Sequence, residues 1–212
     1  DAVRSLTVMF LEMWNAIKKT DTDYTAYFPE ITYTAKQTGY VQPYADNPLD
    51  DEHTGENVYM NVLNSAREYA YFITPYLLIS DEMKKAFTLA ARRGVDVRII
   101  TPGIPDKKFV YQAKRSYYNR LVKKGVRIFE YTPGFCHAKQ CVSDDKAAVV
   151  GTINLDYRSL YHHFENAAAF YHKDAVAGVK ADFDHLFEEC HEVTEQYRSH
   201  RSTALRIGQC IL

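Results

Sequence analysis

No apolar run in the sequence approaches the roughly 20 residues that a helix needs to cross a lipid bilayer. The longest such runs, for example residues 167–171, have the length of a strand. The chain does not open with the pattern of a signal peptide. It also lacks an excess of charge of either sign, since 26 Lys and Arg face 27 Asp and Glu. Tight nucleic-acid binding usually requires a basic excess, so nucleic acid is not an expected partner.

Cysteine is scarce as well. Cys136, Cys141, Cys190 and Cys210 are too widely spread to indicate a disulfide framework, and they are typical of free thiols in a reducing compartment. A zinc site on Cys136, His137 and Cys141 is not favoured, because the two cysteines would point to opposite faces of a strand and no second ligand pair follows. The sequence therefore predicts neither a metal nor another cofactor.

The remaining composition is that of a globular protein, with 46% hydrophobic and 25% charged residues among 212. Apolar periodicity predicts helices over residues 1–19, 57–68, 81–93, 107–124 and 174–198. Strands are expected over residues 39–44, 69–74, 95–101, 126–131, 135–142, 147–151 and 165–171. This order predicts an α/β fold with a mixed, mostly parallel sheet flanked by helices on both faces. No internal repeat is evident.

Two segments are distinguished along the chain. Residues 1–38 form a helix and an irregular connection, which we interpret as left over from a preceding domain. Residues 39–212 form the main domain. The sequence begins at Asp1 without an initiator Met, and no helix start signal precedes the first helical pattern. We therefore expect the chain to be part of a longer protein.

The most informative motif is His137-x-Lys139-x4-Asp144. On a strand His137 and Lys139 would point to the same face, because side chains repeat with a period of two. An imidazole beside an ammonium group fills a core poorly but suits a phosphate: the Lys neutralises an oxygen, and the His attacks phosphorus or protonates a leaving group. Asp144 falls in the hairpin link, where we expect it to accept backbone N–H bonds.

Three further polar residues follow the motif. Thr152 and Asn154 come at the turn after the next strand, and both offer neutral hydrogen-bond donors to phosphate oxygens. Glu165 begins the third strand, where its carboxylate could fix the tautomer of an imidazole.

This combination, with Gly151, resembles the HKD signature of the phospholipase D superfamily. Nearly the whole chain resembles the C-terminal half of bacterial cardiolipin synthases. Beyond the motif, the resemblance extends to residues 39–42, 73–83, 91–103, 114–131 and 154–160. Members of the superfamily join two such motifs across one active site, and this chain has one. Single-motif members dimerise, whereas cardiolipin synthases carry both motifs in one chain.

The resemblance implies a phosphatidyltransferase that needs no metal. One histidine attacks phosphorus to form a phosphohistidine, and the other protonates the leaving alcohol and then activates the incoming hydroxyl. In a cardiolipin synthase, the phosphatidyl group passes from one phosphatidylglycerol to another. His137 is assigned the acid–base role, with nucleophile as the second possibility. Lys139, Thr152 and Asn154 would bind phosphate, and Glu165 would orient a histidine from either half. Asp144 completes the catalytic motif.

The expected partners are an anionic phospholipid, the membrane surface, and either an N-terminal half carrying the first motif or a second copy as a homodimer. A full-length protein is expected at the bacterial cytoplasmic membrane through helices outside this sequence, and the present stretch is expected to be soluble. Two alternatives stay open. The chain could be a homodimeric phosphodiesterase or nuclease with water as acceptor, or an inactive half-domain.

Overall fold

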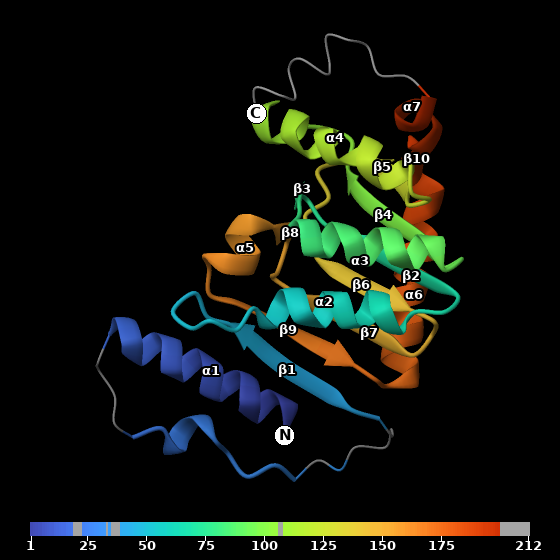
Figure 1. Cartoon of the computed structure of the whole chain (residues 1–212). Helices are drawn as coiled ribbons and strands as arrows, with labels where there is room; N and C mark the ends of the chain where they lie inside the picture. Colours follow the sequence, from blue (N-terminus) through green and yellow to red (C-terminus); the bar gives the residue numbers. More distant parts are fainter. Residues whose placement is uncertain (19–22, 33, 35–38, 106–107, 200–212) are drawn as a thin grey trace.

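An eight-stranded sheet organises the chain in the computed structural model, which describes residues 1–18, 23–32, 34, 39–105 and 108–199. The strand order is β1-β9-β7-β6-β2-β4-β5-β10 (Figure 1). Only the pairings of β2 with β4 and of β4 with β5 are parallel; the others are antiparallel. The bounds are β1 Val41–Asp46, β2 Tyr69–Ile73, β4 Asp96–Pro102, β5 Arg127–Tyr131, β6 Gln140–Ser143, β7 Ala147–Gly151, β9 Glu165–Phe170 and β10 Cys190–Glu192.

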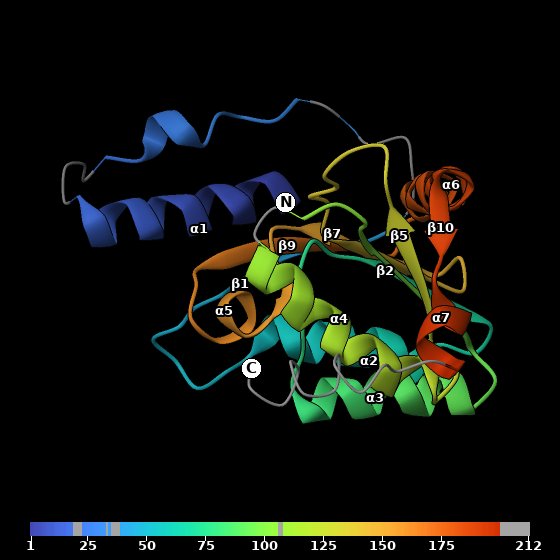
Figure 2. The ribbon, with the colours of Figure 1, turned by 90° about the horizontal axis from the view of Figure 1, so that it is seen from above.

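Helices lie on both faces of this sheet (Figure 2). One face carries α2 (Thr54–Ser65), α3 (Asp81–Arg92) and α4 (Lys108–Val122), and the opposite face carries α6 (Lys173–Glu189). At the β1 edge lies α1 (Ala2–Ile17). None of the helices that the structure describes is both long enough and apolar enough to cross a lipid bilayer.

Each sheet face has its own apolar core. Beneath α2, α3 and α4 the larger core includes Leu63, Phe72 and Phe87, which are fully buried. The smaller core lies under α6 and is built from Tyr71, Ile100, Val142 and other strand residues, against which α6 packs with Val176 and Phe183. The predicted α/β class, with helices on both faces of a mixed sheet, is confirmed. Within the eight-stranded sheet, parallel pairing is confined to β2, β4 and β5.

The C-terminal helix is shorter than the sequence predicts. A single helix over residues 174–198 is wrong, because the chain leaves α6 at Glu189 and forms β10 before α7 (Thr194–Ser199). The break lets Cys190–Glu192 pair antiparallel with β5, and the Ile128 N–H donates to the Thr194 hydroxyl at 3.0 Å. Edge pairing of this kind depends on contacts distant in sequence, so local helical periodicity did not indicate it.

Short elements that the sequence did not predict surround the carboxyl end of β7. Leu77–Leu78 (β3) pairs in parallel with Leu155–Asp156 (β8), and α5 (Tyr157–Tyr161) follows at once. A 3₁₀ turn, η1 (Thr25–Tyr27), lies in the connection after α1. The strand predicted over residues 135–142 begins only at Gln140, so the stretch before it is extended chain outside the ladder.

Asp144 occupies the hairpin turn between β6 and β7, with a φ of 51°. Its carboxylate accepts three backbone N–H bonds, from Arg67 at 2.8 Å, Glu68 at 3.0 Å and Tyr69 at 2.9 Å. Burial raises the pKa of Asp144, but these bonds and the nearby Lys146 outweigh it, so the pKa lies below its ordinary value. The carboxylate therefore ties the hairpin to the start of β2.

We expect Asp144→Asn to lower the free energy of unfolding by about 1–2 kcal/mol at neutral pH. Asn tolerates the left-handed backbone, but it sets an amide N–H group against the Arg67 N–H. A depressed carboxyl pKa stabilises the fold above the unfolded-state pKa of about 3.9, and this contribution is lost as the pH falls through the folded-state pKa. The difference between variant and wild type should therefore shrink under acid conditions.

Urea unfolding of both proteins at neutral and acidic pH measures this difference. Asp51→Asn, which changes an exposed carboxylate, is the matched control. Equal stability of Asp144→Asn and wild type at neutral pH would contradict the role assigned to the tether.

Candidate active site

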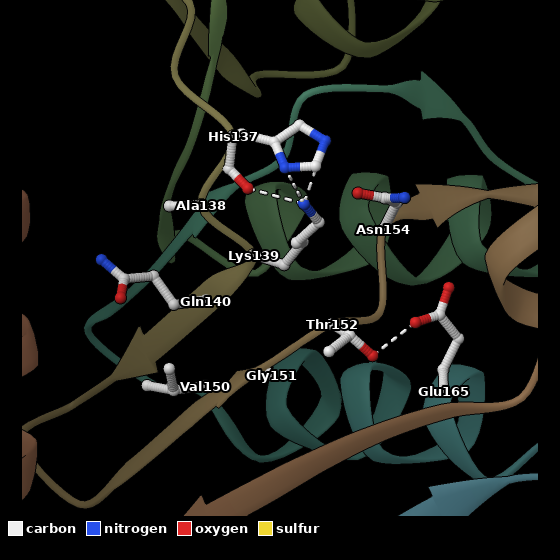
Figure 3. A pocket seen from close by; sticks show the side chains of 9 residues that line it. All are labelled: His137, Ala138, Lys139, Gln140, Val150, Gly151, Thr152, Asn154 and Glu165. Carbon is white, nitrogen blue, oxygen red and sulfur yellow. Dashed lines mark hydrogen bonds between the residues drawn. The ribbon is translucent and has the colours of Figure 1, made fainter.

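A cavity of about 530 Å³ opens where β6 and β9 begin and β7 ends. Because β6 runs antiparallel to β2, the start of β6 lies beside the end of β2. The cavity therefore lies at the edge where the parallel strands β2, β4 and β5 end. Carboxyl ends of parallel strands are a common place for ligands in α/β sheets. The cavity is lined by His137, Ala138, Lys139, Gln140, Val150, Gly151, Thr152, Asn154 and Glu165 (Figure 3).

His137 and Lys139 are in direct contact. The Lys139 Nζ lies 2.7 Å from His137 Nδ1 and 3.3 Å from Nε2, and it donates to the His137 carbonyl at 2.6 Å (Figure 3). Burial lowers the pKa of Lys139, while the carboxylates of Glu165 and Asp156 oppose that shift. The two side chains thus share one side of the extended segment, as the period-two argument expects, although the segment precedes the strand.

Gly151 lets three strands meet at the cavity. Its N–H donates to the Lys139 carbonyl at 3.1 Å, and the next N–H, of Thr152, donates to the Asn166 carbonyl at 2.8 Å. A Cβ atom at Gly151 would collide with Ala167 and with the backbone of Asn166. The absence of a side chain therefore permits β9 to approach β7 closely, and the Glu165 carboxylate then accepts a hydrogen bond from the Thr152 hydroxyl.

The turn after β7 is held from the core side. Tyr59, on α2, donates its hydroxyl to the Ile153 carbonyl at 2.8 Å, and the Leu155 N–H donates to the Thr74 hydroxyl at 3.1 Å. Both anchors are buried. Thr152 and Asn154 are therefore displayed by a turn whose backbone is fixed from two elements, α2 and the end of β2.

Glu165 is the centre of a hydrogen-bond network. The Thr152 hydroxyl donates to Oε2, and the Ser159 hydroxyl donates to Oε1 at 2.9 Å. Ser159 in turn accepts the Asn154 amide Nδ2 at 2.8 Å. Among the described residues the Oδ1 of Asn154 is buried and finds no hydrogen-bond partner. A buried unpaired acceptor carries a desolvation cost, which is typical of a site arranged for a ligand rather than for stability alone.

The histidine that Glu165 approaches is His163, whose Nδ1 lies 3.7 Å from Oε1. Arg158 donates its Nε to His163 Nε2 at 2.7 Å. These groups border a second cavity of about 280 Å³, which shares Asn154 with the first and is lined by Tyr76, Leu78, Asn154, Asp156, Arg158, Ser159 and His163. Burial raises the pKa of Asp156.

The structure brings together five of the six residues singled out from the sequence: His137, Lys139, Thr152, Asn154 and Glu165 all line one cavity. Asp144 lies at the other end of the hairpin, where it binds backbone instead. Sequence reasoning gave no role to Ser159, which joins Asn154 to Glu165. Its position, five residues after Asn154 and six before Glu165, was the available signal.

The arrangement suits an anion on which one substituent is replaced by another, as in a phosphodiester. An ammonium group, a hydroxyl and an amide converge on an imidazole, which supplies charge compensation beside a group able to attack or to move a proton. Within the described residues no group of three or more His, Cys, Asp or Glu side chains is placed to hold a metal ion.

Residues 59–187 match the family model described as "Cardiolipin synthase, PLD-like domain". A protein of Streptococcus mutans described as uncharacterized is 50% identical over 194 residues, which are 92% of this chain and 42% of that protein. A cardiolipin synthase of a Geobacillus species is 33% identical over 212 residues, which are 100% of this chain and 42% of that enzyme. The chain thus spans about two fifths of the length of these relatives.

Solved structures show the same fold at low sequence identity. The phospholipase D family member Nuc of Salmonella typhimurium superposes with a TM-score of 0.63 at 17% identity, covering 76% of this chain and 100% of that one. Phosphatidylserine synthase of Haemophilus influenzae gives a TM-score of 0.64 at 15% identity, covering 81% of this chain and 48% of that one. The family match over residues 59–187, together with this fold, establishes that the chain belongs to the phospholipase D-like domain family of cardiolipin synthases.

Proposed function

We propose that the chain supplies one half of the active site of a phosphatidyltransferase that makes cardiolipin from phosphatidylglycerol. The convergence of His137, Lys139, Thr152, Asn154 and Glu165 on one open cavity carries the proposal. The names of the relatives support an enzyme of the phospholipase D type. The second histidine would come from a facing unit of the same fold, in another part of a longer chain or in a second copy.

The reaction has two displacements at phosphorus. The histidine of the facing unit attacks the phosphorus of phosphatidylglycerol, and the bond from phosphorus to the glycerol oxygen breaks while His137 gives that oxygen its proton. Glycerol leaves, and His137 is now neutral. His137 then takes the proton from a hydroxyl of a second phosphatidylglycerol, whose oxygen attacks phosphorus as the bond from phosphorus to histidine breaks.

Lys139 has two roles in this scheme. Without a ligand its ammonium group contacts the His137 ring and carbonyl. A phosphate oxygen in the cavity competes for that ammonium group, which frees the imidazole for proton transfer and neutralises the phosphate. Thr152 and Asn154 add hydroxyl and amide contacts, and Glu165 positions both, directly and through Ser159.

The second cavity offers space for a head group next to the phosphate. It adjoins the first at Asn154, and its polar lining of Asp156, Arg158 and His163 suits hydroxyl groups of glycerol. A bound head group there would place its oxygen near the phosphate site. This supports an alcohol rather than water as acceptor.

Glycerophosphoglycerol, the deacylated head group of phosphatidylglycerol, should bind the isolated chain and shift the ring resonances of His137 in NMR spectra of histidine-labelled protein. Lys139→Met should weaken binding by about 10-fold or more, because the charge that meets the phosphate is lost. Lys146→Met, which removes an exposed ammonium group at the far end of the hairpin, should bind normally. Equal affinities of the two variants would contradict the placement of phosphate at Lys139.

His137→Ala should reduce cardiolipin formation by about 1,000-fold or more, because proton transfer to the leaving glycerol is lost. The assay combines this chain with the unmatched remainder of the Streptococcus mutans relative, phosphatidylglycerol in mixed micelles and mass-spectrometric detection of lipid products. His191→Ala, on the exposed strand β10, is the control and should keep full activity. Unchanged activity of His137→Ala would refute the proposal.

The same mixture assigns the histidine roles. After acid-free quenching, a phosphatidyl adduct on the polypeptide from the Streptococcus mutans relative would agree with the acid–base role of His137. An adduct on His137 would instead make His137 the nucleophile. Products from this chain alone would mean that two copies build the site. Phosphatidic acid without cardiolipin would favour a phosphodiesterase that uses water.

A further inference from the structure

Six large apolar side chains of α1 form one stripe that stays largely exposed in the described part of the chain. Their spacing of three and four residues places them on a single helix face. All six are exposed, from 38% for Leu6 to 86% for Ile17; the set is Val3, Leu6, Phe10, Met13, Trp14 and Ile17. A stripe of this length on one helix is costly to leave in water and marks a contact surface.

The helix meets its own chain with a different side. Leu11 is buried and lies away from the stripe. The helix as a whole lies beside β1 at the sheet edge (Figure 1). Thr7 and Asn15, one turn before and after Leu11, are partly buried on the same side. Thus α1 has two contact faces, and only the narrower one is used within the described structure.

The stripe has a counterpart in this chain, on α6. Aligned without a gap from Asp1 on Asp174, the sequences share Asp-Ala-Val at the start and Phe at the central position, Phe10 and Phe183. Five stripe residues of α1 align with apolar residues of α6, and Ile17 aligns with Cys190, the first residue after it; the aligned set is Val176, Val179, Phe183, Leu186, Phe187 and Cys190. All six belong to the smaller core that α6 covers.

The two helices differ at the position that is buried in α1. Leu11 of α1 aligns with Asp184 of α6, which is exposed and paired with Lys180. A helix that only covers a sheet needs a polar residue there, whereas a helix held between two bodies needs an apolar one. The pattern of α1 is thus that of α6 with a second contact added.

We propose that the α1 stripe covers the sheet face of a second unit of this fold, as α6 covers the sheet face of the present unit. The occupant is a phospholipase D-type sheet that lacks its own α6-like helix. The relatives are more than twice as long as the matched region, so they have room for such a unit. The inference goes beyond the proposed chemistry, because it assigns a contact surface outside the catalytic cavity.

Two other occupants fit the observations less well. In a second copy of this chain the equivalent sheet face is already covered by α6, whose Val176 and Phe183 are fully buried. Helices that lie on anionic membranes carry a basic polar face. The described polar positions of α1 and its ends are balanced instead, with Arg4 and Lys18 against Asp1 and Glu12.

Binding of the unmatched remainder of the Streptococcus mutans relative tests the occupant. Trp14 is the only tryptophan of the chain, so 5-fluorotryptophan labels the stripe alone, and its ¹⁹F resonance should shift when the unlabelled remainder is added. Phe10→Asp should weaken the complex at least about 100-fold, because a charge would enter an apolar interface. Ala16→Asp, exposed and off the stripe on the same helix, should bind normally.

Several results would overturn the inference. They are equal binding of Phe10→Asp and Ala16→Asp, a ¹⁹F shift produced by phosphatidylglycerol vesicles alone, and self-association of the chain that Phe10→Asp abolishes. If Phe10→Asp leaves the complex intact while cardiolipin synthesis still needs both polypeptides, the contact lies elsewhere and the proposed function stands.

A helix transplant tests the fit without a partner. Residues 174–190 are replaced by the sequence of residues 1–17, so that the α1 stripe must cover this chain's own sheet. The chimera should unfold cooperatively on heating, and a second chimera with Asp at the transplanted Phe10 position should not fold. If both chimeras fail to fold, the stripe is not that of a sheet-covering helix, and the inference is wrong.

Discussion

The candidate site depends on the close approach of β7 and β9 at Gly151. A side chain at Gly151 would collide with β9. At this point the Gly151 N–H donates to the Lys139 carbonyl, and the adjacent Thr152 N–H donates to the Asn166 carbonyl. The cavity residues come from three separate stretches of sequence, and this crossing brings them together. Rigid strands on either side hold them with little conformational freedom, which favours binding of a small anion.

The polar network around Glu165 continues this constraint into the turn. Glu165 accepts a hydrogen bond from Thr152 directly and is linked to Asn154 through Ser159, so one carboxylate orients two polar side chains of the cavity. Anchors from Tyr59 and Thr74 fix the same turn from the core side. The site is therefore supported by both the sheet and the larger core. Preorganised polar groups of this kind stabilise charge without having to reorganise during reaction.

Sequence reasoning reached the α/β class and the cavity residues because both leave local signals. Periodicity predicts α3 and β4, and the spacing of His137 and Lys139 predicts that both side chains lie on one side of the chain. Elements that depend on contacts distant in sequence were not predicted. Strand β10 forms by pairing with β5, and the two-residue strands β3 and β8 form by pairing with each other. The likeness of α1 to α6 also escaped, because it consists of a few positions on one helix face and becomes visible only when one stripe is seen buried and the other exposed.

The place of α6 and β10 in the chain has a consequence for synthesis on the ribosome. All strands of the sheet except β10 precede α6 in the sequence, so the aromatic face formed by Tyr69, Tyr71 and Phe129 stays uncovered until α6 has been synthesised. The edge of β5 also stays unpaired until β10 has been synthesised. Nascent chains with exposed apolar faces and free strand edges are prone to misassociation. Delayed closure makes the last described segment of the chain the step on which chaperone assistance and folding yield depend.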